Sequence, residues 1–180
     1  MDVEYKISKE ELVDFHMRHV GETKVFKHQM INNAVFNILV FLLLVFFSKY
    51  TLDLIAFTIL FLVFMLFRKK IIRYKLRKNF FKIYSFDKYK NLFEDTKLTI
   101  IENGLEINTQ FVEKIYNWNS IKSIHLVENY IFVRTVNNED LLIPIFSFKP
   151  IENKQIFLDA IVSNTDLELQ KQYPKDIKYL

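Results

Sequence analysis

Hydrophobic residues are distributed unevenly along this chain, and one long run dominates the pattern. Residues 34–67 read AVFNILVFLLLVFFSKYTLDLIAFTILFLVFMLF and contain only two charged residues, Lys49 and Asp53. A single helix over these 34 residues would be about 51 Å long, far more than the roughly 30 Å hydrocarbon core of a bilayer. The pattern therefore predicts a hairpin of two helices, at about 31–47 and 52–67, with a polar bend around Lys49.

Both halves of this hairpin are apolar on every side, unlike the helices of a soluble core. An ordinary surface helix has one polar face, and the rest of this chain is too short to cover two wholly apolar helices. Each half has about 17 residues, near the lower limit for a transmembrane helix. We therefore expect residues 31–67 to span a membrane twice; the alternatives are a pair of buried core helices and a shallow re-entrant hairpin.

Basic residues on both flanks predict the orientation of the hairpin. Lys24 and Lys27 precede the first span and a cluster that begins at Arg68 follows the second, whereas the bend offers only Lys49. Loops rich in Lys and Arg stay on the cytoplasmic side of a membrane. The distribution of Lys and Arg thus predicts a multi-pass membrane protein with both termini in the cytoplasm.

The segment 68–90 is predicted to be a basic juxtamembrane helix. It holds ten basic residues and one acidic residue, whereas 91–180 holds nine basic and thirteen acidic residues, so the overall charge of +4 conceals two oppositely charged parts. One face of this helix carries an apolar stripe formed by Ile72, Leu76, Phe80 and Ile83. The candidate site for anionic lipid consists of Arg68, Lys69, Lys70, Arg73, Lys75, Arg77 and Lys78.

These cations allow two interpretations that the sequence leaves open. Each gains on the order of 1 kcal/mol from anionic lipid close to the inner leaflet, so together they could hold the helix flat on the membrane. Alternatively they act only by fixing the topology of the hairpin. In both cases the anionic inner leaflet is a predicted partner, and nucleic acid is not, because the chain lacks a recognised nucleic-acid module.

Residues 1–30 precede the hairpin and show the patterns of a short strand and an amphipathic helix. Hydrophobic and polar residues alternate over 3–7, as they do in a half-buried strand. Ser8 with Glu11 three positions later forms a capping-box pattern for a helix that runs toward Val20. We expect this cytoplasmic element to dock on the membrane surface or on the C-terminal domain.

From Lys97 onward the hydrophobic period changes to two, which predicts β-strands in a cytoplasmic domain at 91–163. Asn103-Gly104 separates two alternating runs and suits a type I′ turn, because both of its positions need positive φ. Pro144 cannot donate to a strand ladder and therefore belongs at an edge or a strand end. Further strands are predicted at 114–118, 121–127, 130–136 and 141–145.

The end of the chain completes the predicted fold. After Pro150, the apolar residues Ile156, Phe157, Ala160 and Ile161 have helical spacing, and the charged segment 164–180 is predicted to be a loosely ordered tail. The predicted fold class is membrane α+β, with a two-helix transmembrane hairpin and a small antiparallel β sheet or partial barrel closed by one C-terminal helix. The residues with structural roles are Asn103, Gly104, Trp118 as a core residue, and Pro144.

The order of these elements, with the sequence YNWNSIKSIHLVENYIFVRTVNNEDLLIPIFSF, resembles the YcxB-like family of small bacterial membrane proteins. The N-terminal VEYKISKEELVDF is similar to the start of those proteins, so the likeness covers nearly the whole chain. The resemblance implies that the membrane is the bacterial cell (inner) membrane. It also implies that the C-terminal domain is pleckstrin-homology-like (PH-like), with a strongly bent sheet and one C-terminal helix. Members commonly have a basic residue soon after an Ile-Pro pair, whereas this chain continues Ile145-Phe146-Ser147-Phe148.

The sequence lacks the residues that several kinds of chemistry require. Two glycines cannot form a glycine-rich phosphate loop, and a chain without cysteine has neither thiolate catalysis nor disulfides. His16 and His19 lie three positions apart near Asp14, which is only part of a metal site. Acidic pairs such as Glu139-Asp140 fall in turn contexts. We therefore predict no enzyme activity, no cofactor and no metal.

The patterns together favour a membrane-anchored interaction or regulatory protein that presents its PH-like domain at the inner leaflet. Confinement at a membrane raises the effective concentration of a domain against other membrane proteins, so a membrane or cytoplasmic protein is the expected partner, with a homo-oligomer as a further option. One alternative is a bacteriocin-immunity-type self-protection protein. The other is an accessory subunit of a membrane transporter, favoured if Asp53 or Asn37 faces a protein interior.

Overall fold

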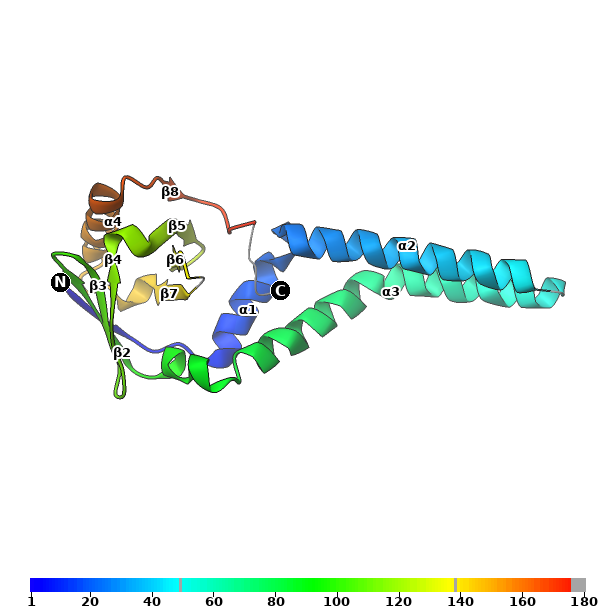
Figure 1. Cartoon of the computed structure of the whole chain (residues 1–180), viewed down its shortest axis with the longest axis horizontal. Coiled ribbons are helices and arrows are strands. Elements are labelled where there is room, and N and C mark those ends of the chain that lie inside the picture. Colours follow the sequence, from blue (N-terminus) through cyan, green and yellow to red (C-terminus); the bar gives the residue numbers. More distant parts are fainter. Residues whose placement is uncertain (49, 138, 176–180) are drawn as a thin grey trace. The chain divides into compact units, whose positions relative to one another are not determined.

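A computed structural model describes residues 1–48, 50–137 and 139–175 and divides the chain into two compact units (Figure 1). The β domain contains residues 1–15 and 81–174, and the helical unit contains 16–80 together with Lys175. The helical unit is thus an insertion in the sequence of the β domain. The predicted N-terminal element at 1–30 is divided between the two units, and its first half belongs with the C-terminal strands.

Two long apolar helices, α2 (Lys24–Phe47) and α3 (Thr51–Ile83), make up most of the helical unit. α2 begins after its N-cap Thr23, whose side chain accepts a hydrogen bond from the backbone N–H of Phe26. Both helices are long and apolar enough to cross a membrane, and their apolar windows are not buried inside the protein. The predicted break between two helices is confirmed, although Lys49 itself lies outside the described residues.

α3 runs without interruption from the second predicted span into the basic segment. The sequence predicted separate elements at 52–67 and 68–90, whereas the structure has one helix of 33 residues that ends at Ile83. The 3-10 helix η2 (Asp87–Phe93) follows it. The helix continues because no glycine or proline interrupts residues 51–83, and every residue around the junction at 67–70 is compatible with a helix.

The β domain consists of two four-stranded sheets, in the orders β1-β2-β3-β4 and β7-β6-β5-β8. The first sheet contains β1 (Asp2–Tyr5), β2 (Thr96–Ile101), β3 (Gly104–Asn108) and β4 (Glu113–Asn117). The second contains β5 (Ile121–Val127), β6 (Tyr130–Thr135), β7 (Asp140–Pro144) and β8 (Leu169–Gln170). The other elements are α1 (Lys9–His19), α4 (Asn153–Thr165), and the 3-10 helices η1 (Val20–Glu22), η3 (Trp118–Ser120) and η4 (Ile145–Ser147).

This layout confirms the α+β class and corrects the predicted sheet. Strand pairs are antiparallel except for β5 with β8, which run parallel, so the second sheet is mixed. Over the described ranges each strand pairs only within its own sheet, and no barrel is closed. The core is made of strand residues from both sheets together with Phe148, which follows η4, and Phe157, Leu158 and Ile161 of α4. The predicted apolar helix after Pro150 therefore does cover the strands.

The first strand of the chain pairs with a strand that follows both long helices. β1 lies antiparallel to β2, with Val3 opposite Leu98 and Tyr5 opposite Thr96. Val3 and Leu98 are both buried in the core. Of the two docking sites expected for the N-terminal element, the structure selects the C-terminal domain for β1.

The turn between β2 and β3 lies one residue earlier than predicted. Ile101 pairs with Gly104, so the two loop residues are Glu102 and Asn103, and neither has positive φ. The type I′ prediction for Asn103-Gly104 is therefore wrong. Gly104 belongs to β3, with φ at 158°, and a Cβ there would lie 2.0 Å from the carbonyl oxygen of Tyr116. Glycine is required because β4 approaches the backbone, and not because of the turn.

The predicted loose tail is ordered over residues 164–175. β8 adds to the second sheet through Leu169 and Gln170. Tyr173 is 2% exposed, and its ring centre lies 5.7 Å from that of Phe15 and 5.9 Å from that of Phe132. This aromatic packing holds a segment that has no hydrophobic periodicity; residues 176–180 of the predicted tail lie outside the described residues.

Candidate functional site

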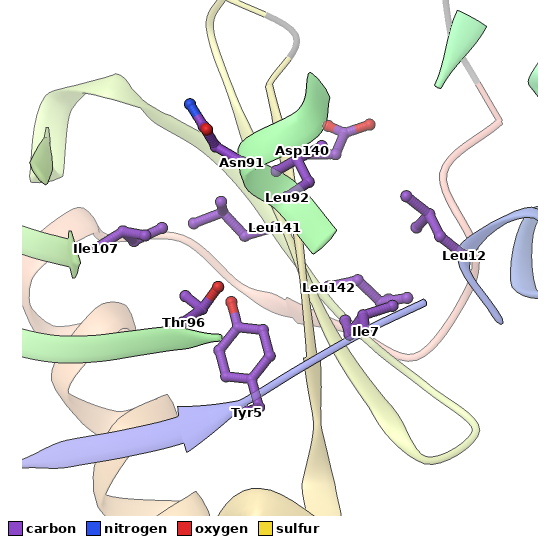
Figure 2. Close-up of a pocket in the computed structure, with 10 residues that line it drawn as sticks. All are labelled: Tyr5, Ile7, Leu12, Asn91, Leu92, Thr96, Ile107, Asp140, Leu141 and Leu142. Carbon is purple, nitrogen blue, oxygen red and sulfur yellow. The ribbon is translucent and has the colours of Figure 1, made fainter. Parts of the chain in front are cut away.

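A small apolar cavity lies in the β domain between the first sheet and β7 (Figure 2). Its volume is about 40 Å³. The residues around it are Tyr5, Ile7, Leu12, Asn91, Leu92, Thr96, Ile107, Asp140, Leu141 and Leu142. Leu92 of η2 and Leu141 of β7 face Tyr5 of β1 across this space (Figure 2). The cavity is apolar because hydrophobic residues of both sheets and of η2 converge there.

A larger and more polar cavity of about 270 Å³ adjoins the first. The two share five lining residues, Asn91, Leu92, Ile107, Asp140 and Leu141. Its further lining residues are Tyr89, Thr109, Val112, Lys114, Tyr116, Asn137 and Glu139. An apolar cavity beside a more polar one is compatible with a binding site in which buried surface supplies affinity and hydrogen-bonding groups supply selectivity.

Three side chains form a polar cluster in the wall of the larger cavity. The Tyr116 hydroxyl donates to Oε2 of Glu139 over 2.8 Å, and Lys114 forms an ion pair with the same oxygen. The Lys114 ammonium also lies 5.0 Å from the centre of the Tyr116 ring, within the range of a cation–π interaction. Burial raises the pKa of Tyr116 above its ordinary value of 10.0, and the hydrogen bond to Glu139 adds to this effect. Tyr116 is therefore a neutral donor at physiological pH.

A buried ion pair lies next to this cluster, and one of its residues, Asp140, also lines the larger cavity. Nε of Arg134 in β6 donates to Oδ1 of Asp140 in β7 over 3.1 Å, and their side chains are 1% and 8% exposed. Thr135 and Glu139 also bond to each other, through the Thr135 hydroxyl and the Glu139 backbone. These contacts fix the start of β7 and hence the position of Glu139.

The larger cavity is bounded by two edge strands. β4 ends the first sheet and β7 ends the second, and residues of both line the cavity. Beside β4 the surface is unusually apolar, since Phe111, Val112 and Ile115 are 72%, 36% and 50% exposed. An edge strand with exposed apolar residues is a template for an additional strand from another chain. Together these features are suited to an extended peptide segment that places one side chain in the cavity.

The seven predicted lipid-binding cations all lie on α3, and they are not equivalent. Lys69, Lys70, Lys75, Arg77 and Lys78 are exposed, whereas Arg68 and Arg73 are partly buried. Nη2 of Arg73 donates to the backbone carbonyl oxygen of Met17 over 2.7 Å, so this residue tethers the end of α1. Arg73 is therefore occupied by a protein contact.

The apolar stripe of the basic segment faces protein and not lipid. Ile72, Leu76 and Phe80 are buried, and the Phe80 ring stacks on the His16 ring with 5.0 Å between their centres. Both interpretations of the cations stay predictions, although burial in the protein leaves this stripe unavailable for insertion into a bilayer.

The residues with predicted structural roles occupy well-defined positions. Trp118 packs against the core, and its Nε1 donates to the carbonyl oxygen of Glu102 over 2.9 Å. Pro144 is the last residue of β7, an edge strand, as its missing N–H requires. The helix predicted to run toward Val20 is α1, which ends at His19 and is followed by η1, where nothing lies within 4 Å of a Cβ added at Gly21.

The predicted partial metal site is not assembled in the part of the chain that the structure describes, which holds no cluster of three His, Cys, Asp or Glu residues. His16 is buried against Phe80 instead. The sequence analysis predicted neither the buried Arg134–Asp140 pair nor the adjoining cavities. One signal was present, because Arg134 interrupts the apolar strand Tyr130–Val136, where a charge needs a buried partner.

Comparisons with known proteins give no further guidance. No family model, no curated protein and no solved structure matches this chain.

Proposed function

We propose that this protein is a membrane-anchored binding protein whose β domain, with a PH-like arrangement of strands and helix, captures a segment of a partner protein at the cytoplasmic face of the bacterial inner membrane. The pairing of β1 with β2 carries the first half of this proposal. Because these strands lie in one sheet, both ends of the intervening hairpin must emerge on the same side of a bilayer. An even number of crossings satisfies this requirement, and two exposed apolar helices supply it.

The flanking charges support the cytoplasmic side. Lys24 and Lys27 lie at the start of α2, and the cations from Arg68 onward lie beyond the apolar part of α3. Both groups would have to cross the membrane in the opposite orientation, which the asymmetry of Lys and Arg disfavours. A reporter or a labelled cysteine placed at either end of the chain should therefore be inaccessible from outside the cell.

The space between β4 and β7 supports the second half of the proposal. It combines a free strand edge, a cavity of about 270 Å³ and exposed apolar residues beside it. A partner strand along β4 would gain backbone hydrogen bonds, and its side chain in the cavity would meet Lys114, Tyr116 and Glu139. We expect binding without catalysis.

Site-specific photocrosslinking in living cells tests the binding site. A photoreactive residue at Ile115, beside the cavity, should give one discrete adduct whose fragments map to a single segment of the partner. The matched control is Ile156 on α4, which is similarly exposed at 57% against 50% for Ile115. The adduct at Ile115 should weaken with Phe111→Ser. Equal adducts at both positions, or none at Ile115, would contradict the proposal.

The transporter-subunit alternative has one residue in its favour and one against it. Asp53 is exposed in the first turn of α3 and not enclosed by the protein. Asn37, in contrast, lines a groove between the two long helices.

A further inference from the structure

An aromatic groove of about 240 Å³ runs along one side of the helical hairpin. Its lining residues are Phe36, Asn37, Val40, Phe41 and Leu44 of α2 with Phe57, Leu60, Phe61 and Phe64 of α3. The Phe41 and Phe61 rings stack with 4.5 Å between their centres and hold the two helices together. Eight of these nine residues are apolar, and Asn37 is the exception.

If the hairpin spans a membrane, placing the polar side chain of Asn37 at this depth costs free energy. It lies six residues after Ile31, or about 9 Å along the helix axis from the start of the predicted span. Its Nδ2 donates to Oδ1 of Asn33 over 3.1 Å, which uses one of its two N–H groups. Over the described residues, no other hydrogen bond of this side chain is formed. In hydrocarbon the remaining N–H and the carbonyl oxygen need partners, which lipid chains do not provide.

We propose that a second copy of this chain docks in the groove, with the two Asn37 carboxamides facing each other across a twofold axis along the membrane normal. A carboxamide is self-complementary, because each Asn37 can donate one N–H and accept one on its oxygen. A twofold axis brings the same patch of both copies together, which is the arrangement that this complementarity needs. The inference rests on the proposed membrane insertion of the hairpin.

Two other occupants explain the groove less well. A lipid acyl chain could fill the aromatic walls but would leave the Asn37 amide without partners. A helix from a different protein could satisfy Asn37 only with its own polar residue at the same depth, whereas a second copy carries that residue by necessity. Polar side chains at helix interfaces are a common means of association in membranes.

The absence of cysteine from the chain makes disulfide trapping a clean test, because any bond must join two introduced cysteines. Val40→Cys places a thiol in the groove, one turn from Asn37. Leu39→Cys places a thiol at a similar depth outside the groove, because Leu39 is rotated by about 200° from Asn37 around the axis of α2 and does not line the groove. In oxidised native membranes, Val40→Cys should give a disulfide-linked dimer and Leu39→Cys should not.

Substitutions of asparagine identify the interaction that drives pairing. In the Val40→Cys background, Asn37→Leu should weaken the dimer about tenfold, and Asn37→Gln should retain most of it. The matched control is Asn32→Leu, which makes the same chemical change at an exposed residue outside the groove. Energy transfer between two labelled copies in vesicles gives the same ranking without a covalent bond.

Three outcomes overturn the inference: equal crosslinking from positions 39 and 40, no crosslinking from position 40, or a crosslink from position 40 only to a different protein. Retention in alkali-washed membranes separates this inference from the function on which it rests. A chain that washes out contradicts membrane anchoring itself. A chain that is retained but stays monomeric contradicts only the second copy.

Discussion

The guanidinium of Arg134 and the carboxylate of Asp140 form an ion pair between β6 and β7, with 3.1 Å between Nε and Oδ1 and almost no exposure to solvent. Removal of one partner from a buried pair costs about 3–5 kcal/mol, because the other charge then lacks its counterion. Asp140→Ala should therefore lower the free energy of unfolding by about that amount. Denaturant titration followed by the fluorescence of Trp118 measures it.

The double substitution Arg134→Met with Asp140→Leu provides the control for this prediction. Apolar replacement of both charges removes the desolvation cost as well as the attraction, so the double variant should be more stable than Asp140→Ala alone. If the single and double variants unfold at the same denaturant concentration, the pair does not stabilise the start of β7.

Gly104 should be intolerant of even the smallest side chain. An added Cβ would lie 2.0 Å from the Tyr116 carbonyl oxygen and 2.8 Å from its carbon, so β3 and β4 would have to separate. Gly104→Ala should destabilise the β domain by about 1–3 kcal/mol. Gly21→Ala is the matched control, because nothing lies within 4 Å of its added Cβ, and it should leave the unfolding midpoint unchanged or raised.

Alkaline pH should destabilise the β domain through its buried tyrosines. Burial raises the pKa of Tyr5 and, together with Glu139, that of Tyr116 above 10.0. Above pH 10 the unfolded chain releases these protons while the folded chain keeps them, so rising pH favours unfolding. The contribution of these two tyrosines to the free energy of unfolding should thus be constant between neutral pH and pH 10 and fall above it.

Tyr116→Phe should reduce this alkaline loss of stability, because the variant has one fewer phenol that must ionise on unfolding. Tyr74→Phe, at a residue that is 69% exposed on α3, should leave the slope unchanged. The measurement is a series of denaturant titrations from neutral to alkaline pH. A slope at alkaline pH that is the same in Tyr116→Phe as in the parent would contradict the prediction.

The cations of α3 should differ in their effect on bound lipid according to their distance along the helix. Since α3 is continuous, Lys75, Arg77 and Lys78 lie about 12–17 Å beyond Phe67 at about 1.5 Å per residue, whereas charges are screened over about 8 Å. Changing Arg68, Lys69 and Lys70 to Gln should lower the share of anionic lipid that co-purifies in mild detergent. The same change at Lys75, Arg77 and Lys78 should leave it nearly constant, as lipid mass spectrometry would show.

Hydrophobic periodicity predicted where strands and helices lie along the chain better than it predicted which strands pair. The bounds predicted for 121–127 are those of β5, and the break between the long helices was also predicted correctly. Both depend on local patterns that alternate or stop within a few residues. The pairing of β1 with β2 could not be predicted in this way, because no local signal links two strands separated by both long helices.

The candidate site could not be predicted for the same reason, because no local pattern shows which distant residues lie together. Glu139 and Asp140 have the composition of a polar turn, and only the fold reveals that Asp140 pairs with Arg134 while Glu139 bonds to Tyr116. The prediction of a loose tail was wrong for residues 164–175 for the same reason. Tyr173 is a lone aromatic residue, and its packing against Phe15 and Phe132 depends on tertiary structure.

The insertion of the hairpin between β1 and β2 also sets the order of events during synthesis. β1 leaves the ribosome first, but its partner strand is translated only after both long helices have been made. The first strand of the nascent chain therefore stays unpaired while the hairpin is made and, if the hairpin spans a membrane as proposed, while it enters the bilayer. Defects in the translocation machinery that delay this step should leave β1 accessible to proteases in newly made chains, even though none of its own residues has changed.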